Sequence, residues 1–167
     1  MVKAIIYRSN SGHTEDYAKR MGKKLNIPCY TMKEAKKNLT KNDEIVYLCW
    51  ICASRLCGAI RVKKKYNIVC YGAVGTYPKE TSYTESLRIA NNLDKPFFYL
   101  RGGIDYKKLN GFFTKTLKMV GKAFEKEATQ ENQEMIQLFK EGGNYVSDDN
   151  IEEIVNYIKQ RNEEKKK

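Results

Sequence analysis

The chain runs Ser9-Asn10-Ser11-Gly12-His13-Thr14 directly after an apolar segment, 4–7, and directly before a helix-like segment, 15–21. Three hydroxyl groups, one flexible glycine and the unpaired amides of a helix start can surround a phosphate dianion. The turn therefore predicts a phosphate-binding loop. The alternative is an ordinary strand-to-helix turn in which Ser11 or Thr14 caps the helix.

The loop lacks the features of two common phosphate-binding motifs. The nucleoside-triphosphate loop needs the lysine of G-x-x-x-x-G-K-[ST], and the dinucleotide fingerprint needs the three glycines of G-x-G-x-x-G. Residues 9–14 contain one glycine and neither lysine nor arginine. The sequence therefore argues against both of these ligand classes.

Short apolar segments alternate with amphipathic ones along the chain. The pattern predicts strands at 2–7, 28–32, 44–50, 67–71 and 96–100, and helices at 14–25, 33–39, about 82–92 and 149–160. This alternation is typical of an α/β fold, a doubly wound parallel sheet covered by helices on both sides. With right-handed crossovers and a ligand at the first loop, we expect the strand order 2-1-3-4-5.

Length, charge and cysteine content bound the class of protein. A chain of 167 residues predicts one domain, 1–162, followed by a charged tail, 163–167. The odd cysteine count, five, and the lack of a signal segment favour a reducing cytoplasm, and no apolar run is long enough for a membrane span.

The formal net charge of +11 favours acidic partners. We expect an acidic redox protein, an anionic small-molecule substrate or peripheral contact with an anionic membrane. Nucleic acid is not expected, because the basic residues form no recognised nucleic-acid-binding motif.

Two segments resemble a known family. The first loop matches [ST]-x-[ST]-G-x-[ST], the phosphate loop of flavodoxins, at Ser9, Ser11, Gly12 and Thr14. The segment from Arg101 reads R-G-G-x-D-Y-x-K-L and is similar to the flavodoxin-domain subfamily that includes bacterial quinone-dependent protoporphyrinogen oxidases. The resemblance implies a flavodoxin-like fold that binds one FMN noncovalently.

The resemblance also implies which residues contact the cofactor. The phosphate would lie in the first loop, and the flavin ring between the loops after the third and fourth strands, at Trp50, Ile51, Cys52, Ala53, Ala73, Val74, Gly75, Thr76 and Tyr77. Trp50 and Tyr77 are the candidates to flank the ring, where stacking contributes about 0.5–1.5 kcal/mol beyond burial. The alternatives are a core-edge aromatic at Trp50 and a partly exposed turn residue at Tyr77.

We assign no catalytic residue and no metal site. His13 is the only histidine, and we expect it to face solvent in the first helical turn, the alternative being a position beside the phosphate. Cys49 and Cys52 form a C-x-x-C pattern that we interpret as buried structural cysteine. Cys49 and Arg55 form C-x5-R, the skeleton of a phosphatase loop, which we keep as a remote alternative.

An insertion, about 104–145, precedes the last helix. Its apolar residues recur at helical intervals with lysines around them, namely Leu109, Phe112, Phe113, Leu117 and Val120. We expect this surface to pack on the host domain, the alternative being an anionic membrane. The sequence leaves three function classes open: an electron carrier, an FMN-dependent oxidoreductase of protoporphyrinogen-oxidase or quinone-reductase type, and a flavin-free adaptor.

Overall fold

The computed structural model describes residues 1–130 and 132–166, and it forms a mostly parallel α/β sheet. The five parallel strands lie in the spatial order β2-β1-β3-β5-β6, and their bounds are β1 (Ala4–Arg8), β2 (Cys29–Thr31), β3 (Glu44–Cys52), β5 (Asn67–Gly75) and β6 (Phe97–Arg101). Counted among themselves, these strands have the predicted order 2-1-3-4-5. The α/β class and this order are therefore confirmed.

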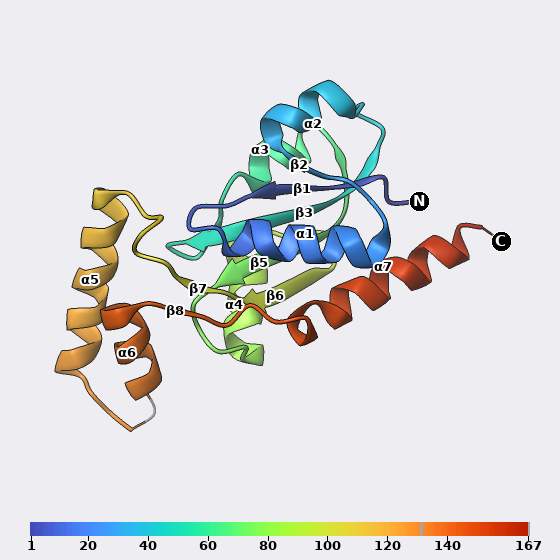
Figure 1. Ribbon diagram of the computed structural model, residues 1–167. Coiled ribbons are helices and arrows are strands. Elements are labelled where there is room, and N and C mark those ends of the chain that lie inside the picture. Colours follow the sequence, from blue (N-terminus) through green and yellow to red (C-terminus); the bar gives the residue numbers. More distant parts are fainter. Residues whose placement is uncertain (131, 167) are drawn as a thin grey trace.

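Helices cover both faces of the sheet (Figure 1). Their bounds are α1 (His13–Leu25), α2 (Met32–Asn38), α3 (Ala59–Lys63), α4 (Thr81–Ala90), α5 (Gly111–Lys126), α6 (Gln133–Glu141), the 3-10 turn η1 (Asp149–Ile151) and α7 (Glu152–Glu164). The short helix α3 was not predicted, since five residues show too little periodicity. Helix α7 extends into the predicted tail, and Lys167 lies outside the described residues.

Alternation along the strands sends neighbouring side chains into two different cores. Ile5 packs with α1 and α7 through Tyr17 and Ile154, whereas Ile6 packs on the opposite face with Ala35 of α2 and others. A side-chain period of two along a strand causes this division. Because helices cover both faces, the strands are mainly apolar. Polar residues that could bind a ligand therefore lie mainly in the loops at the strand ends.

Two strands run further than the sequence predicted. β3 continues to Cys52 and then turns back through Ala53 and Ser54, which have positive φ angles of 46° and 60°, to pair with β4 (Arg55–Leu56). β5 continues to Gly75 because its small residues pair with both neighbouring strands, for example Val74 with Trp50 on one side and Leu100 on the other. Tertiary pairing thus overrides a turn-like sequence.

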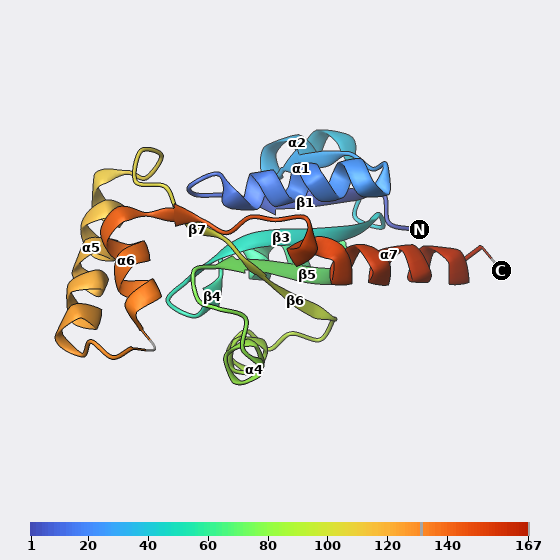
Figure 2. The ribbon, with the colours of Figure 1, turned by 60° about the horizontal axis from the view of Figure 1, so that its bottom comes forward.

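The segment between β6 and η1 forms a separate lobe at one end of the sheet (Figure 2). It comprises α5, α6 and a two-stranded ribbon of β7 (Gly103–Ile104) and β8 (Gly143–Asn144). Its own small core consists of Ile104, Met135, Leu138 and Phe139 with partly buried neighbours around them. Phe112 is 74% exposed and so lies outside this core, contrary to the predicted apolar face; its ring packs edge-on against Phe113 instead.

No helix in the described part of the chain is both long enough and apolar enough to cross a bilayer.

Candidate functional site

The carboxyl ends of β1, β3 and β5 meet at one edge of the sheet. Arg8 at the end of β1 pairs with Cys49, and Trp50 pairs with Val74. The three predicted cofactor segments, 9–14, 50–53 and 73–77, therefore lie at this edge. In an open parallel sheet, ligands bind beyond the carboxyl ends where the strand order reverses, which here is between β1 and β3.

The first loop presents uncapped amides at the start of α1. Gly12 is the residue before the helix, with φ +96°, and no side chain caps it. The Ser9 hydroxyl instead accepts the Gly12 N–H at 3.1 Å, and the Ser11 hydroxyl bonds the His13 Nδ1 at 2.9 Å. The capping alternative for Ser11 and Thr14 is therefore not what the structure shows. The first-turn amides and the helix dipole are left to attract an anion.

His13 does not face solvent, contrary to our expectation. It is only 8% exposed, since α1 begins one residue earlier than predicted and Gly102, from the end of β6, packs against it. A Cβ on Gly102 would lie 3.5 Å from the His13 Cβ. Burial lowers the pKa of His13, with Asp105 opposing this and Lys108 adding to it. The imidazole is thus neutral near pH 7.

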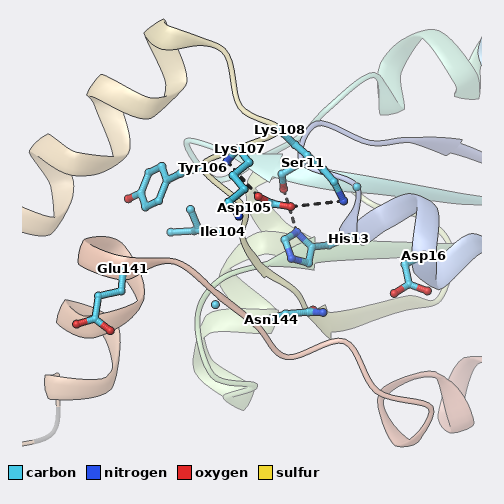
Figure 3. A pocket seen from close by; sticks show the side chains of 12 residues that line it. Ser11, His13, Asp16, Ile104, Asp105, Tyr106, Lys107, Lys108, Glu141 and Asn144 are labelled. Atoms are coloured by element: carbon cyan, nitrogen blue, oxygen red, sulfur yellow. Dashed lines mark hydrogen bonds and ion pairs between the residues drawn. The ribbon is translucent and has the colours of Figure 1, made fainter.

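A positive charge reaches the first loop from the lobe. A Cβ on Gly12 would lie 3.2 Å from the Lys108 Nζ, so the lysine packs directly over the glycine. Lys108 also pairs with Asp105 at 3.4 Å, and Figure 3 shows both side chains beside Ser11 and His13. Sequence analysis missed this cation. The R-G-G-x-D-Y-x-K-L segment that contains it was its only signal, because nothing local places residue 108 beside residue 12.

A cavity of about 410 Å³ opens between the first loop and the lobe. Its walls come from the start of α1, the segment after β7 and the ribbon strand β8 (Figure 3). Ser11, Gly12 and His13 line one side, and Lys107 and Lys108 line another. The cavity is therefore continuous with the predicted phosphate loop, and its lining is mixed in charge, with the carboxylates of Asp16, Asp105 and Glu141 beside the two lysines.

The two candidate ring-flanking aromatics contact opposite ends of α5. The Trp50 ring lies edge-on to Phe113, with the ring centroids 5.4 Å apart. The Tyr77 ring lies 6.2 Å from Phe124 and 5.2 Å from Tyr83. Since eleven residues of helix span about 16 Å, α5 lies across the strand ends and separates the two contacts. The structure brings Trp50 and Tyr77 to one edge, but it does not stack them against each other.

Because β3 and β5 are longer than predicted, fewer of the residues predicted to contact the flavin lie in the loops that follow these two strands. Ala73 and Val74 are buried within β5, and their pairing continues on both sides of that strand. Ile51 and Cys52 belong to the β3–β4 hairpin, with Ala53 at its turn. Of the predicted residues after the third and fourth strands, Ala53, Thr76 and Tyr77 are the ones that lie outside regular strands.

The cysteine patterns fall into two environments. Cys49 is fully buried, and burial raises the pKa of its thiol. Arg55 lies in the hairpin and donates from its guanidinium to the Ala90 carbonyl. The C-x5-R residues therefore do not converge on a common ligand. Cys52 and Cys57 are half-buried and contact each other across the hairpin, with the pKa of Cys57 raised by burial to about 11.

Within residues 1–130 and 132–166, no three side chains of histidine, cysteine, aspartate or glutamate gather into a possible metal site. A scan against protein-family models and a search of curated proteins found no match to the chain.

Buried His13 predicts a specific loss of stability in acid. Its pKa is lowered in the folded chain, so the unfolded chain binds the proton more readily between that lowered value and about 6.5. The free energy of unfolding should therefore fall as pH drops below about 6.5 through this window. Urea titrations at pH 7.5 and pH 5 should show a smaller loss for His13→Gln than for the parent. Equal losses in both proteins would contradict the assignment.

Proposed function

We propose that this chain is a flavodoxin-like protein that binds one FMN noncovalently and carries electrons in a cytoplasmic redox pathway. One observation carries the proposal: an uncapped helix start follows β1 at the point where the strand order reverses. The loop there matches the flavodoxin phosphate motif at Ser9, Ser11, Gly12 and Thr14. The R-G-G-x-D-Y-x-K-L segment, which resembles the protoporphyrinogen-oxidase subfamily of flavodoxin domains, also supports the proposal.

The residues present fit a phosphate monoester. Gly12 has no Cβ, and its positive φ is strained for other residues, so the loop keeps a concave backbone. The uncapped amides supply donors, and the Lys108 ammonium, which also pairs with Asp105 at 3.4 Å, would offset part of the charge of the dianion. To bind a dinucleotide, the backbone would have to approach the pyrophosphate closely at further glycines, and the loop has only one glycine.

The bound flavin would supply the redox chemistry, and the protein would bind and orient it. Ser9, Ser11 and Thr14 would hold the phosphate, and Trp50 would pack beside the flavin ring. Helix α5 contacts the strand ends through Phe113 at Trp50 and Phe124 at Tyr77. The net charge of +11 would draw an acidic redox protein toward this molecule.

A direct binding measurement tests the proposal. The protein should purify yellow and release FMN in acid. Because Trp50 is the only tryptophan, adding FMN to the flavin-free protein should quench its fluorescence until one equivalent is bound. Riboflavin, which lacks the phosphate, should bind at least about tenfold more weakly, since charge-assisted hydrogen bonds contribute about 1.5–3 kcal/mol each. A colourless protein whose Trp50 fluorescence ignores FMN would instead support the flavin-free adaptor.

A second candidate is an FMN-dependent oxidoreductase that acts on a small molecule. The cavity of about 410 Å³ favours it by its place next to the phosphate loop, and its lining combines Lys107 and Lys108 with the carboxylates of Asp16, Asp105 and Glu141. Turnover of protoporphyrinogen or reduction of a quinone without any added protein would support this activity. Reduction only through a separate reductase would support the carrier.

A further inference from the structure

A second cavity, of about 770 Å³, lies on the other side of the first loop between α2 and α3. The end of β1 forms its floor, and the two helices lie next to each other on the same face of the sheet (Figure 1). Ser9 is the only residue of the 9–14 loop that lines it. Ser9 is therefore shared with the proposed phosphate loop, whereas Ser11, Gly12 and His13 line the first cavity and not this one.

The charges in this cavity are nearly all positive. Two arginines and four lysines line it, namely Arg8, Lys33, Lys36, Arg61, Lys64 and Lys65. Its one carboxylate, Glu15, is paired with Lys19 at 2.6 Å. Among the ion pairs of the described residues, none involves the six cations, although the adjacent Lys63 pairs with Asp94 at 3.0 Å. The cavity thus holds uncompensated positive charge.

Helical spacing keeps these cations together. Lys33 and Lys36 are three residues apart in α2, and Arg61 is three residues before Lys64 at the end of α3. Residues at this spacing lie on the same side of a helix, where like charges repel and destabilise it. An anion in the cavity would relieve that repulsion on both helices at once.

Arg8 is an exposed side chain that lies against Gly58 in the wall of the cavity. A Cβ on Gly58 would lie 3.3 Å from the Arg8 Nη1 and 2.7 Å from the Tyr47 hydroxyl oxygen, so the guanidinium sits against a glycine. Its neighbours stay uncharged near pH 7, because burial raises the pKa of Tyr47 and raises that of Cys57 to about 11. A planar guanidinium with free donors is suited to bidentate contact with carboxylate or phosphate.

We propose that the cavity between α2 and α3 binds a small polyanion, a molecule with three or more negative charges on phosphate or carboxylate groups. The number of converging cations sets the charge of the ligand, and the volume of about 770 Å³ admits a molecule larger than a single phosphate. Met32 and Tyr7 add an apolar patch to the wall, which suits a ligand with a carbon skeleton.

Calorimetric titration at constant ionic strength tests this site with two probes, sodium tripolyphosphate and sodium citrate. The probes distinguish phosphate from carboxylate as the preferred group. We expect saturable binding by the parent to at least one probe. In the variant Arg61→Gln with Lys64→Gln, the dissociation constant should rise at least about tenfold, because charge-assisted contacts are lost. Both side chains are exposed, so the fold should survive their replacement.

Two controls keep the result specific. Lys115→Gln with Lys122→Gln removes the same charge from exposed positions on α5 and should leave the dissociation constant unchanged. Ser11→Ala with Thr14→Val alters the FMN loop and should also leave it unchanged, which separates this site from the proposed function. Absence of saturable binding by the parent, equal weakening in the α5 variant, or loss of binding only in the loop variant would overturn the proposal.

Discussion

Replacing Ser11 by alanine and Thr14 by valine in one chain is expected to weaken FMN binding by about 100-fold or more. Two hydrogen bonds to a dianion are lost, each worth about 1.5–3 kcal/mol when charge-assisted, and 1.4 kcal/mol corresponds to tenfold. Ser11 lies in the loop three residues after the end of β1, and Thr14 lies in the first turn of α1. The quenching of Trp50 fluorescence by FMN measures the change.

Riboflavin and a matched hydroxyl pair control this experiment. Riboflavin has no phosphate, so the affinity of the variant for riboflavin should change little. The preference for FMN over riboflavin, measured as the ratio of the two affinities, should therefore fall by about the same factor as the FMN affinity. Thr84→Val with Ser86→Ala removes two hydroxyls from α4, where each bonds a carbonyl of its own helix, and should leave FMN affinity intact. An unchanged ratio in the Ser11 and Thr14 variant would show that the phosphate binds elsewhere.

Gly103→Ala is expected to lower the melting temperature by about 2–12 °C. A Cβ at this position would lie 2.0 Å from the Gly143 carbonyl oxygen, where β7 pairs with β8 in the antiparallel ribbon. Backbone cannot move aside as a flexible side chain does, and overpacking costs about 1–3 kcal/mol, each kcal/mol shifting a domain of this size by about 2–4 °C. The ribbon that joins the lobe to the sheet should therefore loosen.

Limited proteolysis locates this effect, and Gly111→Ala is its control. Cleavage of the Gly103→Ala variant should begin between residues 104 and 145, before the sheet is cut. At Gly111, the first residue of α5, a Cβ would meet nothing within 4 Å, so alanine there should not lower the melting temperature. If the two variants had similar melting temperatures, the close approach of Gly103 to the Gly143 backbone would not contribute to stability in this way.

The sequence alone predicted the parallel sheet because the relevant signals are local. Apolar runs such as 44–50 alternate with amphipathic ones, and the hydroxyl-rich loop marks the strand after which a ligand binds. The ends of β3 and β5 were placed too early. In β5, Gly72 and Gly75 resemble a turn until the neighbouring strands pair with them, and β3 is extended by its hairpin with β4. Local composition cannot reveal that pairing.

The surroundings of the site were beyond the reach of sequence analysis for a related reason. His13 is buried by Gly102, and Lys108 approaches Gly12, across about ninety residues of chain. The polyanion cavity likewise joins Arg8 to two helices that follow different strands. Contacts of this kind depend on how the lobe and the crossover helices pack on the sheet, and short-range sequence patterns carry no information about that packing.

The small core of the lobe has a kinetic consequence. Four buried side chains hold it, Ile104, Met135, Leu138 and Phe139, so it should open at a lower free energy than the sheet unfolds. Opening of the lobe would separate Phe113 from Trp50 and Phe124 from Tyr77. For the FMN site proposed above, we therefore expect release and rebinding of the cofactor to follow these openings, on a microsecond-to-second scale, rather than the rate of diffusional encounter.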